Sequence, residues 1–476
     1  MGNYFMIRDC LPFSEVKRRL KNMDAERTGF FCGRRAFGRT VCQILAAFVL
    51  FLAGAKLLNY LYWQEEDWER ILFHHFYAQE KNIDNICLGS SHVFCGFDPE
   101  ILDEKSGKNN FNLATSGQSL MGSYYLLREA DRRNEIEKVY LELYYTCSTG
   151  GQGSYQEKEA VQISWRITDY MKMSPLKLEA FFHMNPSKYY MDGAFPYVRY
   201  RAHLTEKDWI EDRVTYKRTG NYKKYIYVDG LTEYEDKGYY RTAKEFSNPL
   251  FVRERRPEEM HLTEDAEKYL RKIIEYCQKK EISIVLCAAP MYELEPLSTE
   301  SYDSYAEGIR SVAAEYDVPY YDFNMVKEEY LPIQHPEYFM DAGHLNTSGA
   351  EMYTNFFHKV VSAPEEENAE YFYGSYQEKL ESAEPRVYGL YCTMIDGTKR
   401  QDEGASPGLK MTVAALGEDK VECRIFLTPT GGETYMLQDF SENKEFDVPA
   451  EEHGICHIVW RKMDGTGEEE SLEVLY

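Results

Sequence analysis

The feature that most constrains this chain is a long apolar run near its N-terminus. Residues 41–55 read VCQILAAFVLFLAGA without a charged side chain, and the apolar character resumes after Lys56 and continues to Trp63. A helix over residues 41–63 would be about 34 Å long at about 1.5 Å per residue, enough to cross a hydrocarbon core of about 30 Å. The run therefore predicts a transmembrane signal anchor, assigned to residues 40–63, with the lipid bilayer as its partner.

The flanks of this run carry the signals of a membrane interface. Lys56 can extend its ammonium group toward the lipid headgroups. Aromatic side chains of the kind enriched at the membrane–water interface follow it, at Tyr60, Tyr62 and Trp63. Residues 1–39 hold nine Lys or Arg side chains against four acidic ones, so the positive-inside rule places this segment in the cytoplasm. We expect a single-pass plasma-membrane protein whose C-terminal domains are extracellular.

Two other interpretations of the run stay open. A buried helix of a soluble protein can have the same composition, but it does not require the charge asymmetry around the run. A cleaved signal peptide could use the small residues Ala53-Gly54-Ala55, although the basic segment ahead of the run is unusually long for a signal peptide.

Charge and cysteine usage exclude several classes of partner. The chain has a formal net charge of −24 although its N-terminal segment is basic, so the part after the apolar run is strongly acidic. Such a surface repels phosphate backbones, and no nucleic acid is expected. The 11 Cys residues form no CxxC motif and no Cys/His cluster at metal-ligand spacing, so we expect neither a metal nor a cofactor.

Short apolar strands alternate with helical segments over much of the remaining chain. The expected strands are residues 85–88, 111–114, 139–143, 282–288 and 318–321. Helices are expected after Asp98-Pro99, over residues 119–133, after Thr263, and over residues 302–316 and 347–361. This alternation is typical of an α/β fold in which helices cover both faces of a parallel sheet.

Changes in composition divide the chain into five parts. A polar, Tyr-rich stretch at about 146–257 interrupts the alternation and is interpreted as an insertion. After the charged stretch that begins at Pro364, alternating apolar residues and turn signals predict a small β-sandwich. The expected parts are a cytoplasmic basic segment (1–39), the transmembrane anchor (40–63), an amphipathic stalk helix (64–81), the α/β domain with its insertion (82–363) and the β-sandwich (364–476).

Two short motifs carry side chains suited to acyl transfer through serine. Gly89-Ser90-Ser91 follows the first expected strand, where a serine would lie at the ligand edge of an open sheet. Asp341 and His344 lie three residues apart just before the last helix, so the carboxylate can meet one ring nitrogen while the other faces a serine. Taken singly, the first motif is common in turns and the second is common at helix starts.

Together these motifs resemble the SGNH/GDSL hydrolase superfamily, over about residues 82–363. The resemblance implies a flavodoxin-like doubly wound sheet, with Ser91 as nucleophile, Asp341 as orienting acid and His344 as base. Ser90 then stands where the superfamily has Asp. The segment from Asn112 to Gly117 resembles the second motif of the superfamily, so Gly117 is implied as an oxyanion donor.

The chain departs from the superfamily pattern at the end of the third strand. The superfamily places an asparagine oxyanion donor there, whereas this sequence reads LELYYT over residues 141–146. Gln118 is a candidate replacement donor. His92 could contact substrate, but a structural hydrogen-bonding role is favoured for it.

The Gly-Ser-Ser motif, the single anchor and the missing asparagine are similar to divergent members that handle acyl groups on cell-surface polymers, such as teichoic acid D-alanylation and exopolysaccharide O-acetylation proteins. This resemblance implies an extracytoplasmic esterase or O-acyltransferase that forms an acyl-serine intermediate. The implied partners are an acylated surface glycan or polymer and a membrane-embedded acyl-transfer protein. The alternative is a non-catalytic binding or scaffold subunit of a surface-polysaccharide assembly.

Overall fold

The computed structural model describes residues 13–63, 68–145, 158–220, 223–246, 250–255, 261–395 and 408–476. The chain divides into two compact units. We name the first, which comprises Met1–Gln64 and Ala194–Asn221, the helical unit. The second, which comprises Glu65–Gly193 and Tyr222–Tyr476, is named the body unit.

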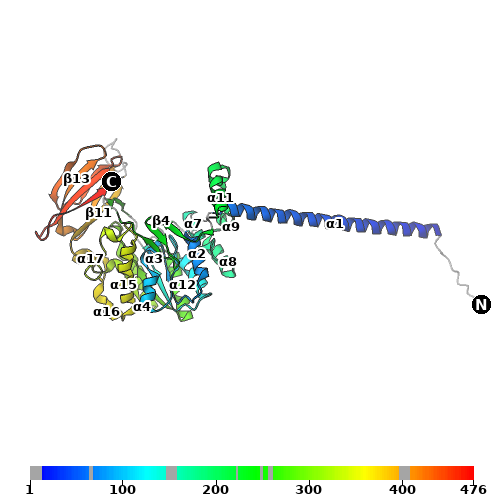
Figure 1. The fold of residues 1–476 in the computed structure, drawn as a ribbon, viewed down its shortest axis with the longest axis horizontal. Helices are drawn as coiled ribbons and strands as arrows, with labels where there is room; N and C mark the ends of the chain where they lie inside the picture. Colours follow the sequence, from blue (N-terminus) through cyan, green and yellow to red (C-terminus); the bar gives the residue numbers. More distant parts are fainter. Residues whose placement is uncertain are drawn as a thin grey trace, which may run out of the picture. The chain divides into compact units, whose positions relative to one another are not determined.

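The helical unit is built on the long helix α1 (Phe13–Tyr62), visible in Figure 1. An 18-residue stretch within its segment Arg39–Tyr62 has a mean hydropathy of 2.2, and the segment is long and apolar enough to cross a membrane. The other elements of this unit are α10 (Pro196–Arg199), the 3₁₀ helix η2 (Arg201–Thr205) and α11 (Lys207–Thr219). Both α10 and α11 contact α1, and the ring of Trp209 lies 5.1 Å from that of Tyr62.

A parallel sheet of five strands forms the centre of the body unit. The strands are β1 (Asn85–Leu88), β2 (Asn110–Asn112), β3 (Lys138–Glu142), β9 (Ser283–Ala288) and β10 (Tyr320–Asp322). Their order across the sheet is β2-β1-β3-β9-β10, and every neighbouring pair is parallel. This is the 2-1-3-4-5 order of flavodoxin-like sheets, which bind ligands where the strand order reverses, at the carboxyl ends of β1 and β3. The prediction of a parallel α/β sheet is confirmed.

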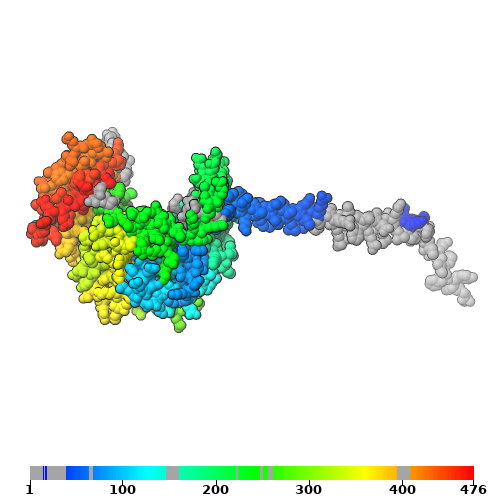
Figure 2. All heavy atoms as spheres, in the orientation of Figure 1, coloured from blue at the N-terminus to red at the C-terminus, as the bar shows by residue number. Residues whose placement is uncertain are grey.

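Helices pack on this sheet in two groups. The main helices are α3 (Ser91–Gly96), α4 (Pro99–Ser106), α5 (Leu120–Asp131), α12 (Glu264–Lys280), α14 (Tyr302–Glu315) and α15 (Thr347–Ser362). Helix α5 packs against α12, and α15 packs against α3 and α4. Figure 2 shows the yellow α15 region and the blue α3–α4 region meeting on one face. The bounds of α4 follow from local chemistry, because Asp98 accepts the N–H of Glu100 at 2.9 Å and Gly107 closes the helix with a φ of 69°.

The expected stalk helix is a core element of the body unit. Helix α2 (Trp68–Ala78) buries Ile71, Leu72, Phe73 and Phe76 in the same core as the sheet. The ring of Phe76 lies 5.7 Å from that of Phe111, which belongs to β2. The stalk prediction for this helix is therefore wrong, because its apolar face is buried in the core of the body unit; residues 64–67 lie outside the described residues.

The Tyr-rich insertion contains regular elements within its described part, although residues 146–157 at its start lie outside it. Its helices are α7 (Lys158–Thr168), α8 (Pro175–Met184), η1 (Ser187–Tyr189) and α9 (Tyr190–Ala194), besides those of the helical unit. Its strands are β4 (Tyr227–Asp229), β5 (Thr232–Tyr234), β6 (Tyr240–Thr242), β7 (Leu250–Phe251) and β8 (Arg253–Glu254). The first three form an antiparallel sheet of their own, and the last two join the C-terminal sheets.

The C-terminal region forms two mainly antiparallel sheets, in the orders β15-β12-β11-β8 and β14-β13-β16-β17-β7. Its strands are β11 (Arg386–Ile395), β12 (Gly408–Leu416), β13 (Val421–Pro429), β14 (Tyr435–Ser441), β15 (Glu445–Pro449), β16 (Gly454–Lys462) and β17 (Glu470–Leu475). Buried and partly exposed residues alternate along β13 and β16, which is the expected period of two.

The junction with the α/β part is helical. It contains α16 (Glu365–Asn368) and α17 (Tyr376–Ser382), and a short helix, α13 (Leu294–Leu297), contacts β11 and β12. Lys379 of α17 forms a buried ion pair with Glu293, and Tyr376 donates to the same carboxylate at 2.8 Å. Because α17 is tied to the α/β part in this way, both parts belong to one compact unit.

Candidate active site

The turn after β1 has a backbone that requires glycine. Gly89 has a φ of 150°, a conformation that L side chains rarely adopt. A Cβ atom at this position would lie 2.6 Å from Val93 Cγ2 and 2.8 Å from both Cβ and Oε2 of Glu142. Helix α3 starts two residues later, so the turn places Ser90 and Ser91 at the carboxyl edge of the sheet.

The two serines of this turn have different surroundings. Ser90 is 1% exposed, and its hydroxyl donates to Glu142 Oε2 at 3.2 Å and accepts the N–H of His92 at 3.4 Å. It is therefore the N-cap of α3. Ser91 is partly exposed, and its Oγ lies 2.7 Å from Nε2 of His344. Of the two hydroxyls, the one that meets an imidazole is that of Ser91.

The loop before α15 holds His344 in a fixed orientation. The carboxylate of Asp341 lies 2.9 and 3.0 Å from His344 Nδ1, and it also accepts the backbone N–H groups of Gly343 at 2.8 Å and His344 at 2.9 Å. Asn346 caps α15 by accepting the N–H of Gly349 at 3.1 Å. With Nδ1–H donating to Asp341, Nε2 is the nitrogen that can accept the Ser91 proton.

The carboxyl group of Asp341 stays ionised over a wide pH range. Burial acts to raise its pKa, but the hydrogen bond and charge of His344 and the N–H groups of Gly343 and His344 outweigh burial and lower the pKa to about 2. Ser91 is thus joined in one hydrogen-bonded chain with His344 and Asp341, which lie far from it in the sequence.

His92 is buried beside this chain. Its ring centroid lies 4.6 Å from that of His344 and 3.8 Å from that of Tyr144, and the side chain is 3% exposed. Neither ring nitrogen has a hydrogen-bond partner among the described residues, so the structural hydrogen-bonding role expected for it is not found. Burial, with the nearby His344, lowers its pKa well below the usual value, so the ring is neutral at pH 7.

Two of the expected oxyanion or substrate residues are buried and donate from their amide groups within the fold. The amide of Gln118 accepts the Thr115 N–H at 2.9 Å and donates to Ser123 Oγ at 2.9 Å, and the side chain is 2% exposed. Asn112 donates to the carbonyl of Val93 at 2.8 Å and so fixes α3 against β2. Neither amide is available to a substrate in this arrangement, so the replacement of the missing asparagine by Gln118 is not supported.

The expected donor Gly117 lies in a turn with a φ of 65°. Its backbone N–H and that of Ser91 donate no hydrogen bond to another described residue. These two N–H groups are therefore available as backbone donors.

The sequence interpretation missed Glu142 as a contact of the nucleophile turn. This residue ends β3 and is 4% exposed, and its Oε2 accepts the backbone N–H of Ser90 at 3.3 Å. The signal available in the sequence was an acidic residue near the end of the apolar strand expected over residues 139–143.

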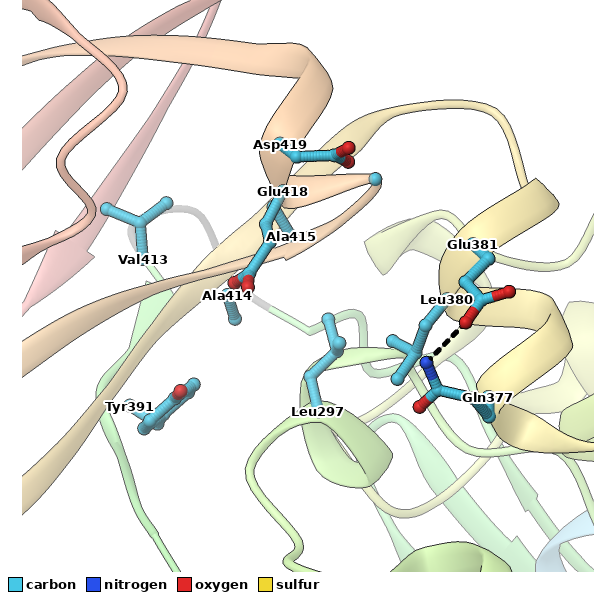
Figure 3. Close-up of a pocket in the computed structure, with 11 residues that line it drawn as sticks. Leu297, Gln377, Leu380, Glu381, Tyr391, Val413, Ala414, Ala415, Glu418 and Asp419 are labelled. Atoms are coloured by element: carbon cyan, nitrogen blue, oxygen red, sulfur yellow. Dashed lines mark hydrogen bonds between the residues drawn. The ribbon is translucent and has the colours of Figure 1, made fainter.

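A pocket of about 480 Å³ lies elsewhere in the body unit, and Figure 3 shows it. It is lined mainly by α17, by β12 and by the turn that follows β12. Gln377 donates to Glu381 at 2.7 Å at its edge. None of the residues that line it belongs to the nucleophile turn or to the His344 loop.

Comparisons with known proteins do not assign the chain to a family. No family model and no curated protein matches it at a significant level. Among solved structures, it is similar to a GDSL-like lipase from Bacteroides thetaiotaomicron, with 9% identity over 63% of this chain and 98% of that one and a TM-score of 0.28. A protein named as a GDSL-like lipase from Parabacteroides merdae gives 12% identity over 60% and 98% of the two chains and the same TM-score. At this TM-score the likeness carries no argument about the site, whose description rests on the contacts above.

Proposed function

We propose that this chain is a membrane-anchored serine esterase or O-acyltransferase that forms an acyl intermediate on Ser91. The observation that carries the proposal is the 2.7 Å contact between Ser91 Oγ and His344 Nε2, with Asp341 holding the opposite ring nitrogen. A serine hydroxyl becomes a nucleophile when an adjacent imidazole accepts its proton and a carboxylate orients that imidazole.

The proposed reaction has two steps that use the same groups. Ser91 Oγ attacks the carbonyl carbon of an ester while His344 Nε2 takes the hydroxyl proton. The ester bond then breaks, and the departing alkoxide takes that proton from His344, which leaves the acyl group on Ser91. In the second step, water or an acceptor hydroxyl attacks the acyl-serine and gives its proton to His344. The bond between the acyl carbon and Ser91 Oγ then breaks, and Ser91 takes the proton back from His344, which returns the free enzyme.

The negative charge on the carbonyl oxygen needs donors during both steps. We assign this role to the backbone N–H groups of Ser91 and Gly117, which no described residue occupies. Loss of a single oxyanion donor costs about 2.7–4 kcal/mol in other enzymes. A site with two donors instead of three is therefore expected to react more slowly than one with the full set.

The substrate class follows from the membrane segment and from the resemblance described for the sequence. A chain whose segment Arg39–Tyr62 is suited to a bilayer would hold its catalytic body close to the membrane surface. We therefore propose acyl esters on a cell-surface glycan or polymer as substrate, with the body outside the cell and the acyl group supplied or accepted there. A membrane-embedded acyl-transfer protein is the proposed partner.

One observation favours a second candidate function, a non-catalytic binding or scaffold subunit. The third strand carries no asparagine at its end, and the amide of Gln118 is occupied by Thr115 and Ser123. A chain that has lost oxyanion donors could keep the fold and the binding surface without turnover.

A fluorophosphonate probe, which reacts covalently with activated serines, separates the two candidates. The purified full chain is expected to be labelled, and Ser91→Ala is expected to abolish the labelling. Ser90→Ala is the matched control, because this neighbouring hydroxyl faces Glu142 instead of His344. It is expected to keep most of the labelling.

A folded wild type that stays unlabelled would favour the scaffold function. Loss of labelling in Ser90→Ala with retention in Ser91→Ala would show that the other serine is the nucleophile.

A further inference from the structure

The buried carboxyl group of Glu142 lies against the nucleophile turn without being part of the proposed triad. Its Oε2 accepts both the backbone N–H and the hydroxyl of Ser90, at 3.3 and 3.2 Å, and the carboxyl also accepts the backbone N–H of Tyr144. Gly89 lacks the side chain that would otherwise collide with this carboxyl. Glu142 therefore joins the end of β3 to the turn that carries Ser91.

We propose that Glu142 is a positioning residue that holds the Gly89-Ser90 turn through its neutral carboxyl group, and that ionisation of this group suppresses acylation of Ser91. This inference rests on the serine chemistry proposed above. It assigns to the third strand a role different from the asparagine donor expected there.

The surroundings of Glu142 contain no cation that would stabilise a carboxylate. Among the described residues it forms no ion pair, and the titratable groups that its charge acts on are Cys287, which is its partner in β9, and Tyr353 of α15. The side chain is 4% exposed. An ionised carboxylate in such a place has only three hydrogen bonds to offset its lost hydration.

The titration of Glu142 is shifted accordingly. Burial raises its pKa to about 8, against the lowering effect of the bonds from Ser90 and Tyr144. Asp341, whose pKa is about 2, does not change its charge near that pH. Glu142 is thus expected to become negatively charged in mildly alkaline solution, whereas the charge of Asp341 stays the same.

Ionisation of Glu142 affects catalysis through the negative charge that it adds near Ser91. The reaction at Ser91 develops a negative charge on the substrate oxygen, beside the backbone N–H groups that begin α3. A second negative charge directly beneath the same turn opposes it, and the effect is strong because the intervening medium is protein. The neutral carboxyl keeps the same contacts with Ser90 without this repulsion.

The test measures the rate of fluorophosphonate labelling of the full chain between pH 6 and 10, corrected for hydrolysis of the probe. The wild-type rate is expected to fall above about pH 8, approaching about tenfold per pH unit. Glu142→Gln keeps the size and the acceptor oxygen but cannot ionise, so its rate is expected to lack this fall and to stay within about threefold of the wild type at pH 7.

Asp322→Asn is the matched control. Asp322 ends β10 in the same sheet and is also buried with a raised pKa, but it bonds to Tyr302 and Asn324 instead of the turn. This variant is expected to keep the wild-type pH profile, which would exclude a general effect of buried carboxyl groups.

The inference is overturned if Glu142→Gln shows the same alkaline fall as the wild type, or if the wild type shows none. Both results leave the serine chemistry intact. A wild type that is unlabelled at every pH would instead remove the serine chemistry and this inference together.

Discussion

At the scale of single residues, the site depends on which of two adjacent serines faces the imidazole. Ser90 and Ser91 are neighbours, yet the hydroxyl of the first is buried against Glu142 and that of the second meets His344. The N-cap position explains the difference, because a serine that caps α3 must turn its oxygen back toward the helix N–H groups. The following side chain then points out of the turn.

Replacement of Asp341 by Asn tests the orienting role of this carboxylate. The amide cannot stabilise an imidazolium at His344, and its NH₂ group favours the wrong tautomer of the ring. We expect Asp341→Asn to lower the labelling rate of Ser91 by about 10³–10⁴-fold, with the protein still folded by circular dichroism. A rate within tenfold of the wild type would contradict the assignment.

The raised pKa of Glu142 also predicts how stability varies with pH. An exposed Glu in the unfolded chain ionises at about 4.3, whereas burial keeps Glu142 protonated in the folded chain up to about pH 8. Between these values the folded state holds one more proton than the unfolded state. The contribution of Glu142 to the free energy of unfolding is therefore at its maximum below about pH 4. It decreases by about 1.4 kcal/mol per pH unit until about pH 8.

The measurement is urea unfolding of the wild type and of Glu142→Gln between pH 5 and 8. As the pH rises, the unfolding free energy of the wild type should fall relative to that of Glu142→Gln by about 1.4 kcal/mol per pH unit. A difference that does not vary with pH would show that Glu142 is ionised in the folded state.

The residues of the site differ in how far the sequence could predict them. Ser91, Asp341 and His344 stand in short motifs next to the ends of expected elements, and the resemblance of these motifs to the SGNH/GDSL superfamily implied that the three residues meet. The roles of Glu142 and Gln118 could not, because they depend on which backbone groups lie within hydrogen-bond reach after the strands align. The amide of Gln118 looks free in the sequence, but in the fold it bonds to Thr115 and Ser123.

At the scale of elements, the strand-to-helix turn depends on Gly89. Alanine at this position must adopt a φ of 150° and overlap with Val93 and Glu142 at 2.6–2.8 Å. We expect Gly89→Ala to destabilise the body unit by at least about 3 kcal/mol in urea unfolding, from backbone strain and overpacking together.

Gly107 provides the matched control for this substitution. It also has a positive φ, 69°, but a Cβ there would meet nothing within 4 Å. Gly107→Ala is expected to cost only about 1–2 kcal/mol. Equal losses for the two variants would show that the contacts of the turn with β3 contribute nothing.

Element boundaries followed the sequence where local chemistry defines them. Residues 85–88 form β1 at the expected bounds, and the capping signals at Asp98 and Gly107 define α4. Helix α2 shows the limit of such patterns, since an amphipathic period does not say what covers the apolar face. Strands of two residues such as β7 and β8 exist only because a neighbouring sheet edge pairs with them.

At the scale of the whole molecule, a segment suited to a bilayer and an acidic body share one chain. The segment Arg39–Tyr62 has the length and hydropathy of a membrane span, and the positive charges that precede it set the expected orientation. We expect the full chain to remain in the membrane fraction after an alkaline carbonate wash. Protease added to intact cells should remove the body and leave an N-terminal tag protected.

Release of the chain by carbonate would contradict a spanning segment. Digestion of the N-terminal tag with protection of the body would show the opposite orientation, in which the proposed surface polymer could not be the substrate.

The proposed chemistry depends on the activation of Ser91 as a nucleophile by His344 and Asp341. Its most direct test is tandem mass spectrometry of the full chain after reaction with a fluorophosphonate, which identifies the residue that carries the adduct. We predict a single adduct on Ser91 that is absent after His344→Ala. An adduct on Ser90 or on any other residue, or an unmodified Ser91 in the folded wild type, would show that Ser91 is not the activated nucleophile.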